Sequence, residues 1–348
     1  MKYKNLALVL ALGLSLSACG QKEDNKAEAP SNEPKTEESL DEPAKEENKD
    51  ESASSDSKAE ETVVYTSFYP IYNLTKQIAG DKMEVKSFTN LKAESHGWEP
   101  SAKDIAELSN SKLMFINGAG MEEWEDSLED STDIELVDTS EGLDLIKANH
   151  EDRDHEEADE DHEHEEDDHE HNHGEFDPHT WLSPKNGLAQ AKVIAEKLSQ
   201  VDPANKDYYM DNYQKIEDEL NTMIDEYSQK FEEASNKNFL VNHKAFSYIA
   251  KDFNLNQIAL TSLTSTDDTD AKTLKEVAEK AKELNINTVF YEMGGSDKSA
   301  KTMAGEIAGE TKALNTLELA TDEDLDNNKT YQELIKYNLE EIYKSLER

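Results

Sequence analysis

Three histidines and one glutamate combine the side chains of a metal site, and each lies in a predicted loop or at the end of a predicted strand. They are His96, His179, His243 and Glu292. In α/β folds, loops at strand ends carry the binding groups. Three neutral imidazoles and one carboxylate supply the nitrogen and oxygen donors of a tetrahedral Zn²⁺ site. A single histidine at a strand end is more often an ordinary hydrogen-bonded residue, so the hypothesis depends on the whole set.

Seven of the ten histidines lie together in a segment of residues 150–175 that is rich in Glu and Asp. They are His150, His155, His162, His164, His169, His171 and His173. The segment has no apolar periodicity, which predicts a flexible loop inserted in a folded lobe. We interpret it as an accessory site that collects metal with low affinity. The alternative is a solubilising tract that binds metal only adventitiously.

The remaining sequence predicts an α/β fold with two lobes, each a parallel sheet flanked by helices. β-rich runs alternate with helical stretches, which is typical of parallel sheets. The predicted strands are residues 63–68, 83–88, 113–117 and 134–138 in one lobe, and 239–242, 257–260, 288–292 and 313–317 in the other. We expect an N-terminal lobe over 62–201, a C-terminal lobe over 236–348, and a long rigid helix over 202–235 joining them. The metal site would lie in the cleft between the lobes.

The linking helix has a recognisable start. Asp202 is a suitable N-cap, and Pro203 suits the first helical position. Apolar and aromatic residues then recur at close to helical spacing.

The N-terminal segment predicts export. Residues 1–18 combine an early positive charge with an apolar core too short to span a bilayer, as in a signal peptide. Small residues precede Cys19, which resembles a bacterial lipobox in which the cysteine is lipidated. Residues 19–61 are rich in charged and other polar residues and have almost no large apolar side chain, so we predict a disordered acidic tether after the lipidated cysteine. The protein would then be held at the outer face of the cell membrane.

Charge and cysteine content narrow the possible ligands. The formal net charge is −43, which would repel nucleic acid and favours cations as ligands. Cys19 is the only cysteine, so acylation would leave neither a disulfide nor a thiolate metal ligand.

Five separated motifs resemble the zinc-binding proteins of ABC metal importers, a group that also includes manganese-binding lipoproteins. The motifs are Glu94-Ser95-His96-Gly97-Trp98-Glu99-Pro100, Asn117-Gly118-Ala119-Gly120-Met121-Glu122-Glu123-Trp124, Asp177-Pro178-His179-Thr180-Trp181-Leu182-Ser183-Pro184, Val241-Asn242-His243-Lys244-Ala245-Phe246 and Val289-Phe290-Tyr291-Glu292. The resemblance implies a metal held between two lobes by His96, His179, His243 and Glu292, with Glu292 or a water as the fourth ligand.

The same resemblance implies a function. Manganese-type relatives typically carry Glu at the third ligand position and Asp at the fourth, whereas this chain has His243 and Glu292. Imidazole suits Zn²⁺ better, so we expect Zn²⁺ capture outside the cell and delivery to an ABC permease, with Mn²⁺ as the alternative cargo. The sequence has no P-loop, so ATP hydrolysis would belong to a separate ATPase subunit. We expect a monomer.

Two other classes of function stay open. Three histidines and a carboxylate acting as a base would fit a zinc hydrolase, which would need an open water-bearing metal position; we expect no enzyme. An adhesin lipoprotein would use surface loops, and its partner binding would survive loss of His96 and His243. Since ligand histidines must be neutral, we expect metal affinity to weaken as the pH falls through about 6.

Overall fold

The computed structural model describes residues 63–108, 111–148, 174–263 and 271–347. Several predictions lie outside these ranges: the signal peptide 1–18, lipidation at Cys19, all of the tether 19–61, and the seven histidines from 150 to 173. Those predictions stay predictions.

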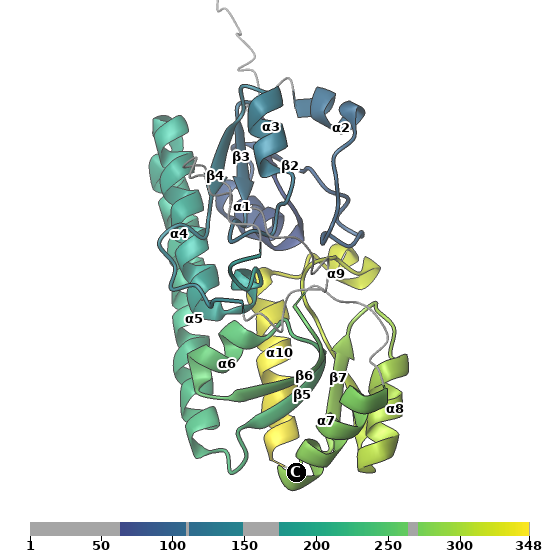
Figure 1. The fold of residues 1–348 in the computed structure, drawn as a ribbon. Coiled ribbons are helices and arrows are strands. Elements are labelled where there is room, and N and C mark those ends of the chain that lie inside the picture. Colours follow the sequence, from purple (N-terminus) through teal and green to yellow (C-terminus); the bar gives the residue numbers. More distant parts are fainter. Residues whose placement is uncertain (1–62, 109–110, 149–173, 264–270, 348) are drawn as a thin grey trace, which may run out of the picture. The chain divides into compact units, whose positions relative to one another are not determined.

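The first lobe contains a four-stranded parallel sheet (Figure 1). Its strands are β1 (Val63–Thr66), β2 (Glu84–Ser87), β3 (Leu113–Ile116) and β4 (Glu135–Asp138), in the order β2-β1-β3-β4. Its helices are α1 (Tyr69–Ala79), α2 (Ala102–Glu107), α3 (Glu125–Ser131) and α4 (Pro184–Val201). A short 3₁₀ turn, η3 (Thr180–Leu182), precedes α4.

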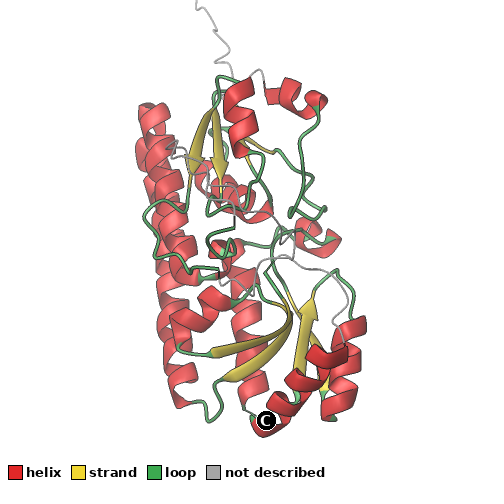
Figure 2. Ribbon diagram, viewed as in Figure 1, coloured by secondary structure: helices red, strands yellow, loops and turns green. Residues whose placement is uncertain are grey.

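The second lobe repeats this topology. Its strands are β5 (Asn238–His243), β6 (Asn256–Thr261), β7 (Thr288–Glu292) and β8 (Glu310–Leu314), in the order β6-β5-β7-β8. Its helices are α6 (Ser247–Phe253), α7 (Ala271–Glu283), α8 (Lys298–Ile307), α9 (Asp322–Asp326) and α10 (Tyr331–Leu346). Figure 2 shows helices around both sheets. The prediction of two parallel α/β lobes is therefore confirmed.

The long helix α5 (Lys206–Glu233) has 28 residues and contacts both lobes. It packs on α1 and α4 of the first lobe and on α6 and α10 of the second. Its buried side chains follow helical spacing and join the largest hydrophobic core. They are Tyr209, Tyr213, Ile216, Leu220, Met223, Tyr227 and Phe231. This helix is the predicted connection between the lobes.

Some element bounds differ from the predicted ones. The linking α-helix begins at Lys206, because a 3₁₀ turn, η4 (Pro203–Asn205), precedes it. The Asp202 carboxylate stabilises this turn by accepting hydrogen bonds from Asn205 Nδ2 (2.6 Å) and the Tyr209 hydroxyl (2.7 Å). Strand β8 ends at Leu314, three residues before its predicted end. Helix α4 was not predicted as a separate element.

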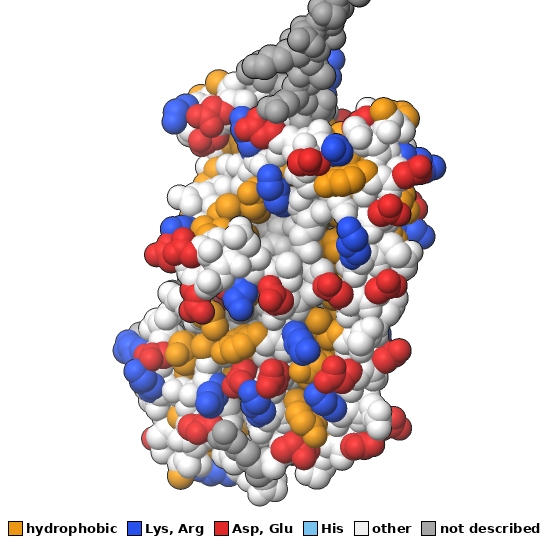
Figure 3. Space-filling view, turned by 180° about the vertical axis from the view of Figure 1, so that it is seen from behind, with side chains coloured by type: hydrophobic (Ala, Val, Ile, Leu, Met, Phe, Trp, Pro, Cys, Tyr) orange, Lys and Arg blue, Asp and Glu red, His pale blue; other side chains and the backbone are white. Residues whose placement is uncertain are grey.

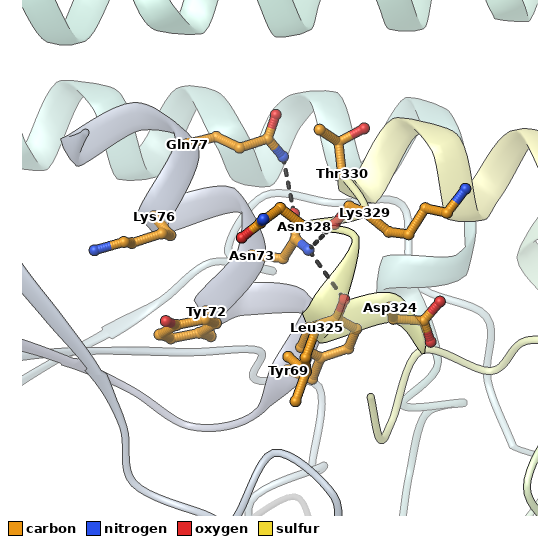
Figure 4. Close-up of a pocket in the computed structure, with 10 residues that line it drawn as sticks. All are labelled: Tyr69, Tyr72, Asn73, Lys76, Gln77, Asp324, Leu325, Asn328, Lys329 and Thr330. Carbon is orange, nitrogen blue, oxygen red and sulfur yellow. Dashed lines mark hydrogen bonds between the residues drawn. The ribbon is translucent and has the colours of Figure 1, made fainter. Parts of the chain in front are cut away.

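Buried hydrogen bonds join the lobes on the side shown in Figure 4, where Asn73 of α1 contacts the turn before α10. Asn73 Nδ2 donates to the Lys329 carbonyl at 2.9 Å, and its Oδ1 accepts from the Tyr331 amide at 2.9 Å. The surface pocket beside them, about 400 Å³ in volume, has no predicted metal ligand in its lining.

Charges of both signs are mixed over the face seen in Figure 3, so the acidic excess of the chain is not gathered there. Within the part of the chain that the structure describes, no helix is both long enough and apolar enough to cross a bilayer.

Candidate metal centre

The structure brings His96, His179 and His243 together, although they come from three separate segments of the chain. Nε2 of His96 lies 3.2 Å from Nε2 of His179. The ring centroid of His243 lies 5.0 Å from that of His179 and 6.0 Å from that of His96. One nitrogen from each ring falls within 4.8 Å of the others. This spacing allows all three imidazoles to reach one ion with modest side-chain adjustment.

His179 is held by its own motif and by the end of strand β3. Its Nδ1 lies 2.8 Å from Asp177 Oδ1. The same oxygen also accepts a hydrogen bond from the backbone amide of His179. Nδ1 therefore carries the proton, and the Nε2 lone pair is left for a metal. Asn117, directly after β3, donates to the Pro178 carbonyl at 3.0 Å and accepts from the Thr180 hydroxyl at 2.6 Å. These bonds fix the turn that carries His179.

Glu122, in the same motif as Asn117, has a structural role. The buried Glu122 carboxylate accepts hydrogen bonds from the amides of Asn117 (2.8 Å) and Gly118 (2.9 Å). Burial raises the pKa of Glu122 to about 7, although these bonds favour the ionised form. Gly118 has a φ of +78°, and a Cβ there would overlap the Asp138 carboxylate, so glycine is required.

His96 lies in the loop between β2 and α2, and aromatic packing anchors that loop. The rings of Phe88 and Trp98 meet edge to face at 5.2 Å, and both pack against Trp124. On its other side the loop contacts the second lobe, where the Ala320 amide donates to the Leu91 carbonyl at 2.6 Å. The His96 side chain stays 16% exposed, so this histidine faces the solvent side of the cluster.

His243 ends strand β5, and Glu292 ends the neighbouring strand β7. The strand order reverses between these two strands, which is where open α/β sheets bind ligands. His243 Nδ1 lies 3.1 Å from Glu292 Oε1, and its Nε2 lies 2.6 Å from the Leu263 carbonyl oxygen. With both nitrogens facing acceptors, the metal-free ring is protonated. Burial alone would lower the pKa of His243, but Glu292 raises it to about 9.

The other two rings are neutral. Burial lowers the pKa of His179 to about 4, although Asp177 opposes the shift. Burial, together with the charge of His243, also lowers the pKa of His96. Both imidazoles are therefore in the form that binds a metal at neutral pH.

Glu318 is a ligand candidate that the sequence analysis missed. Its Oε1 lies 3.6 Å from Nε2 of both His96 and His179, and its side chain is 1% exposed. This oxygen has no hydrogen-bond partner among the described residues. A buried carboxylate oxygen that accepts no hydrogen bond destabilises the folded protein, unless a cation binds to it. With the three histidines, Glu318 makes the three-nitrogen, one-oxygen donor set that suits Zn²⁺.

Polar contacts hold the loop that carries Glu318 between β8 and α9. Trp181 Nε1 donates to the Thr316 carbonyl at 2.7 Å, which links the His179 turn to this loop. Asn338 of α10 accepts the Asn315 amide at 2.8 Å and donates to its carbonyl at 2.6 Å. The candidate ligands of both lobes are thus tied to one another by buried hydrogen bonds.

Glu318 also faces a second carboxyl group, that of Glu94. Burial raises the pKa of Glu318 well above its usual range, and the hydrogen bond and charge of Glu94 add to the rise. Although burial would raise the pKa of Glu94 as well, the hydrogen bond from Glu318 lowers it. The hydrogen bond between these two carboxyl groups therefore raises the pKa of Glu318 and lowers that of Glu94.

Glu292, the predicted fourth ligand, contacts His243 and is not among the donors that lie within 4.8 Å of one another. Its position suits a carboxylate that orients a ligand histidine, as Asp177 does for His179. Its role as a ligand stays a prediction, and Glu318 is the second candidate for that place.

Comparison with known proteins places the chain in a family. The family described as zinc-uptake complex component A, periplasmic (ZnuA), matches residues 64–345. The chain belongs to this family. Its members are solute-binding components of transporters, not an enzyme class, and they work with ABC transporters.

Individual relatives extend this match. The high-affinity zinc uptake system protein ZnuA of Bacillus subtilis is 36% identical over 286 residues, which cover 81% of this chain and 87% of that protein. The zinc-binding lipoprotein AdcA of Streptococcus pneumoniae is 32% identical over 80% of this chain, but the match spans only 54% of AdcA. The structure of the laminin-binding protein Lmb of Streptococcus agalactiae, described as an adhesin with metal transporting activity, matches with a TM-score of 0.70 at 30% identity, covering 82% of this chain and 99% of Lmb.

Proposed function

We propose that this chain captures Zn²⁺ outside the cytoplasm with high affinity and delivers it to an ABC transporter for zinc uptake. The observation that carries the proposal is the convergence of His96, His179 and His243 on one point, with the unpartnered oxygen of Glu318 facing it. Membership of the zinc-uptake family supports the same conclusion.

The donor set favours Zn²⁺ over Mn²⁺. Three nitrogens and one carboxylate suit Zn²⁺, whereas Mn²⁺ prefers carboxylate, carbonyl and water oxygens. The hydrogen bond between Asp177 and His179 adds support, since a carboxylate behind a ligand histidine raises its basicity toward zinc. Mn²⁺ remains the alternative cargo to be measured.

The remaining parts of the proposal concern the segments around the folded lobes. A lipid on Cys19 would hold the protein on the outer face of the membrane, near its permease and the associated ATPase subunit. The tether 19–61 would give the lobes reach, and the histidines of 150–175 would collect zinc beside the cluster. A monomer suffices, because both lobes of one chain supply the candidate ligands.

The adhesin hypothesis is supported by the structural similarity to Lmb, which is described as an adhesin with metal transporting activity. An adhesin would keep its partner binding without His96 and His243, whereas metal capture would not. For a zinc hydrolase, the decisive observation would be turnover by the zinc-loaded protein. The buried cluster and the transport family both favour capture.

The test is a chelator-competition titration with Zn²⁺ and Mn²⁺ on a variant that lacks residues 151–173. We expect one tight Zn²⁺ equivalent and much weaker Mn²⁺ binding. In this background, His179→Ala should raise the zinc Kd at least about tenfold. Even the loss of a side chain that only hydrogen-bonds to a metal ligand weakens metal binding by about this much. Tight zinc binding that needs the deleted tract, or that survives His179→Ala unchanged, would overturn the proposal.

A further inference from the structure

Glu94, His96 and Glu318 form a second group of three metal-binding side chains beside the histidine cluster. One donor atom from each lies within 4.8 Å of the others. The group shares His96 and Glu318 with the proposed zinc site, and Glu94 is the member of its own. The two sites therefore share two ligands, while His179 and His243 belong only to the proposed zinc site.

Burial increases from the second group toward the first. Glu94 is exposed, and the His96 side chain is 16% exposed. The side chains of Glu318 and His179 are 1% and 0% exposed, and that of His243 is 4% exposed. A cation that enters from solvent would meet Glu94 and His96 before it reached His179 and His243.

The environment of Glu318 points to a cation rather than to a chance group of acids. Its Oε1 is buried, has no hydrogen-bond partner among the described residues, and faces Nε2 of His96 at 3.6 Å. One donor oxygen of Glu318 also lies within 4.8 Å of one of Glu94. A divalent cation between these side chains would satisfy the buried oxygen.

The backbone directs Glu94 toward this position. Its Oε1 accepts hydrogen bonds from the backbone amides of Ser95 at 3.2 Å and His96 at 3.4 Å, so the carboxylate folds back over its own loop. The carboxylate therefore lies beside the imidazole of His96.

We propose that Glu94, His96 and Glu318 form a transfer site that receives Zn²⁺ from solvent and passes it inward. This inference rests on the proposed function. The ion would exchange Glu94 for His179 and His243 while His96 and Glu318 stay bound, so it would never lose all of its protein ligands. The same route in reverse would release the ion. Glu94 would then control the rates of binding and release without contributing to the final complex.

The test compares the full chain with its Glu94→Gln variant, which has the same shape and no charge. Glu99→Gln is the matched control, because Glu99 is exposed in the same loop and belongs to neither donor group. One equivalent of Zn²⁺ is mixed with each protein in a stopped-flow instrument, and release is followed with excess chelator. We expect Glu94→Gln to slow binding and release alike by about tenfold, so that Kd changes much less than either rate, since loss of a group next to a metal has effects of this size.

Other outcomes have distinct meanings. Unchanged rates in Glu94→Gln, with a tight wild-type site, would refute the transfer site and leave the proposed function intact. A higher Kd caused by faster release alone would make Glu94 a ligand of the final complex and would also refute the proposal. A wild-type chain without a tight site would refute both.

An equilibrium measurement gives a second check. Co²⁺ bound to His179→Ala should remain at the transfer site, so adding Glu94→Gln there should weaken Co²⁺ binding further. In the wild-type background the same change should leave the Co²⁺ absorption spectrum unaltered. Equal effects of Glu94→Gln in both backgrounds would contradict the overlap of the two sites.

Discussion

Replacing Glu318 with Gln tests which carboxylate completes the zinc site. The change keeps the shape of a side chain that is 1% exposed and removes its ability to bind a metal as a carboxylate. The affected oxygen lies 3.6 Å from Nε2 of both His96 and His179. A carboxylate about 4 Å from one positive charge gains about 4 kcal/mol at an effective dielectric constant of about 20. Loss of the proton that Glu318 holds offsets part of that gain.

We therefore expect Glu318→Gln to weaken zinc binding by about 10- to 100-fold, or about 1.4 to 2.8 kcal/mol. Proton release should change as well. Because burial and Glu94 raise the pKa of Glu318, zinc binding should release more protons from the wild type than from the variant, which has no acid at this position. Calorimetry in buffers of different ionisation enthalpy measures both quantities.

Glu292→Gln is the matched comparison, because it neutralises the carboxylate next to His243. If Glu318→Gln leaves both Kd and the proton count unchanged while Glu292→Gln abolishes tight binding, the reasoning fails and Glu292 is the fourth ligand.

Three further predictions concern the neighbouring residues. Because the pKa of His243 is about 9 and zinc binds the neutral ring, zinc affinity should fall at least about tenfold for each pH unit below 9, and a flat Kd between pH 6 and 8 would contradict this. Asp177→Asn should raise the zinc Kd by about 10- to 100-fold, because it removes the carboxylate that hydrogen-bonds to His179 Nδ1. Chelator competition measures this Kd, and an unchanged value would show that Asp177 does not support zinc binding by His179. Gly118→Ala should lower the free energy of unfolding by about 2 kcal/mol or more in urea denaturation, since its φ is +78°; equal stability would show that the turn can relax.

The pH prediction differs from the one made from the sequence, and the difference has a physical cause. A typical histidine titrates near 6.5, so the sequence alone suggested a loss of affinity near pH 6. The contact between His243 and Glu292 raises one pKa, and burial lowers that of His179. Neither shift can be seen in a sequence, because both depend on the packing of residues far apart in the chain.

The lobes, the long helix and the three histidines could be predicted because each leaves a local signal. Alternating β-rich and helical runs indicate parallel sheets, and a histidine directly after such a run indicates the ligand edge. Glu318 also follows a predicted strand, 313–317, so the rule that selected Glu292 could have selected it. The sequence analysis selected Glu292, which ends the predicted strand 288–292 and lies in a matching motif, whereas only the folded structure brings Glu318 beside His96.

The start of α5 was predicted too early for a related reason. Asp202 and Pro203 fit a helix start, and they do begin a helical turn, but it is the 3₁₀ turn η4. The hydrogen bond from Tyr209 to Asp202, which stabilises this turn, spans seven residues and cannot be inferred from cap preferences alone.

The most direct test of the central claim is a structure of the zinc-loaded protein with anomalous diffraction at the zinc edge. We predict one strong peak bound by His96, His179 and His243 at about 2.0 to 2.1 Å and by Glu318 at about 2.0 to 2.2 Å. A peak coordinated only by histidines of the segment 150–175, with no zinc between the lobes, would contradict the account.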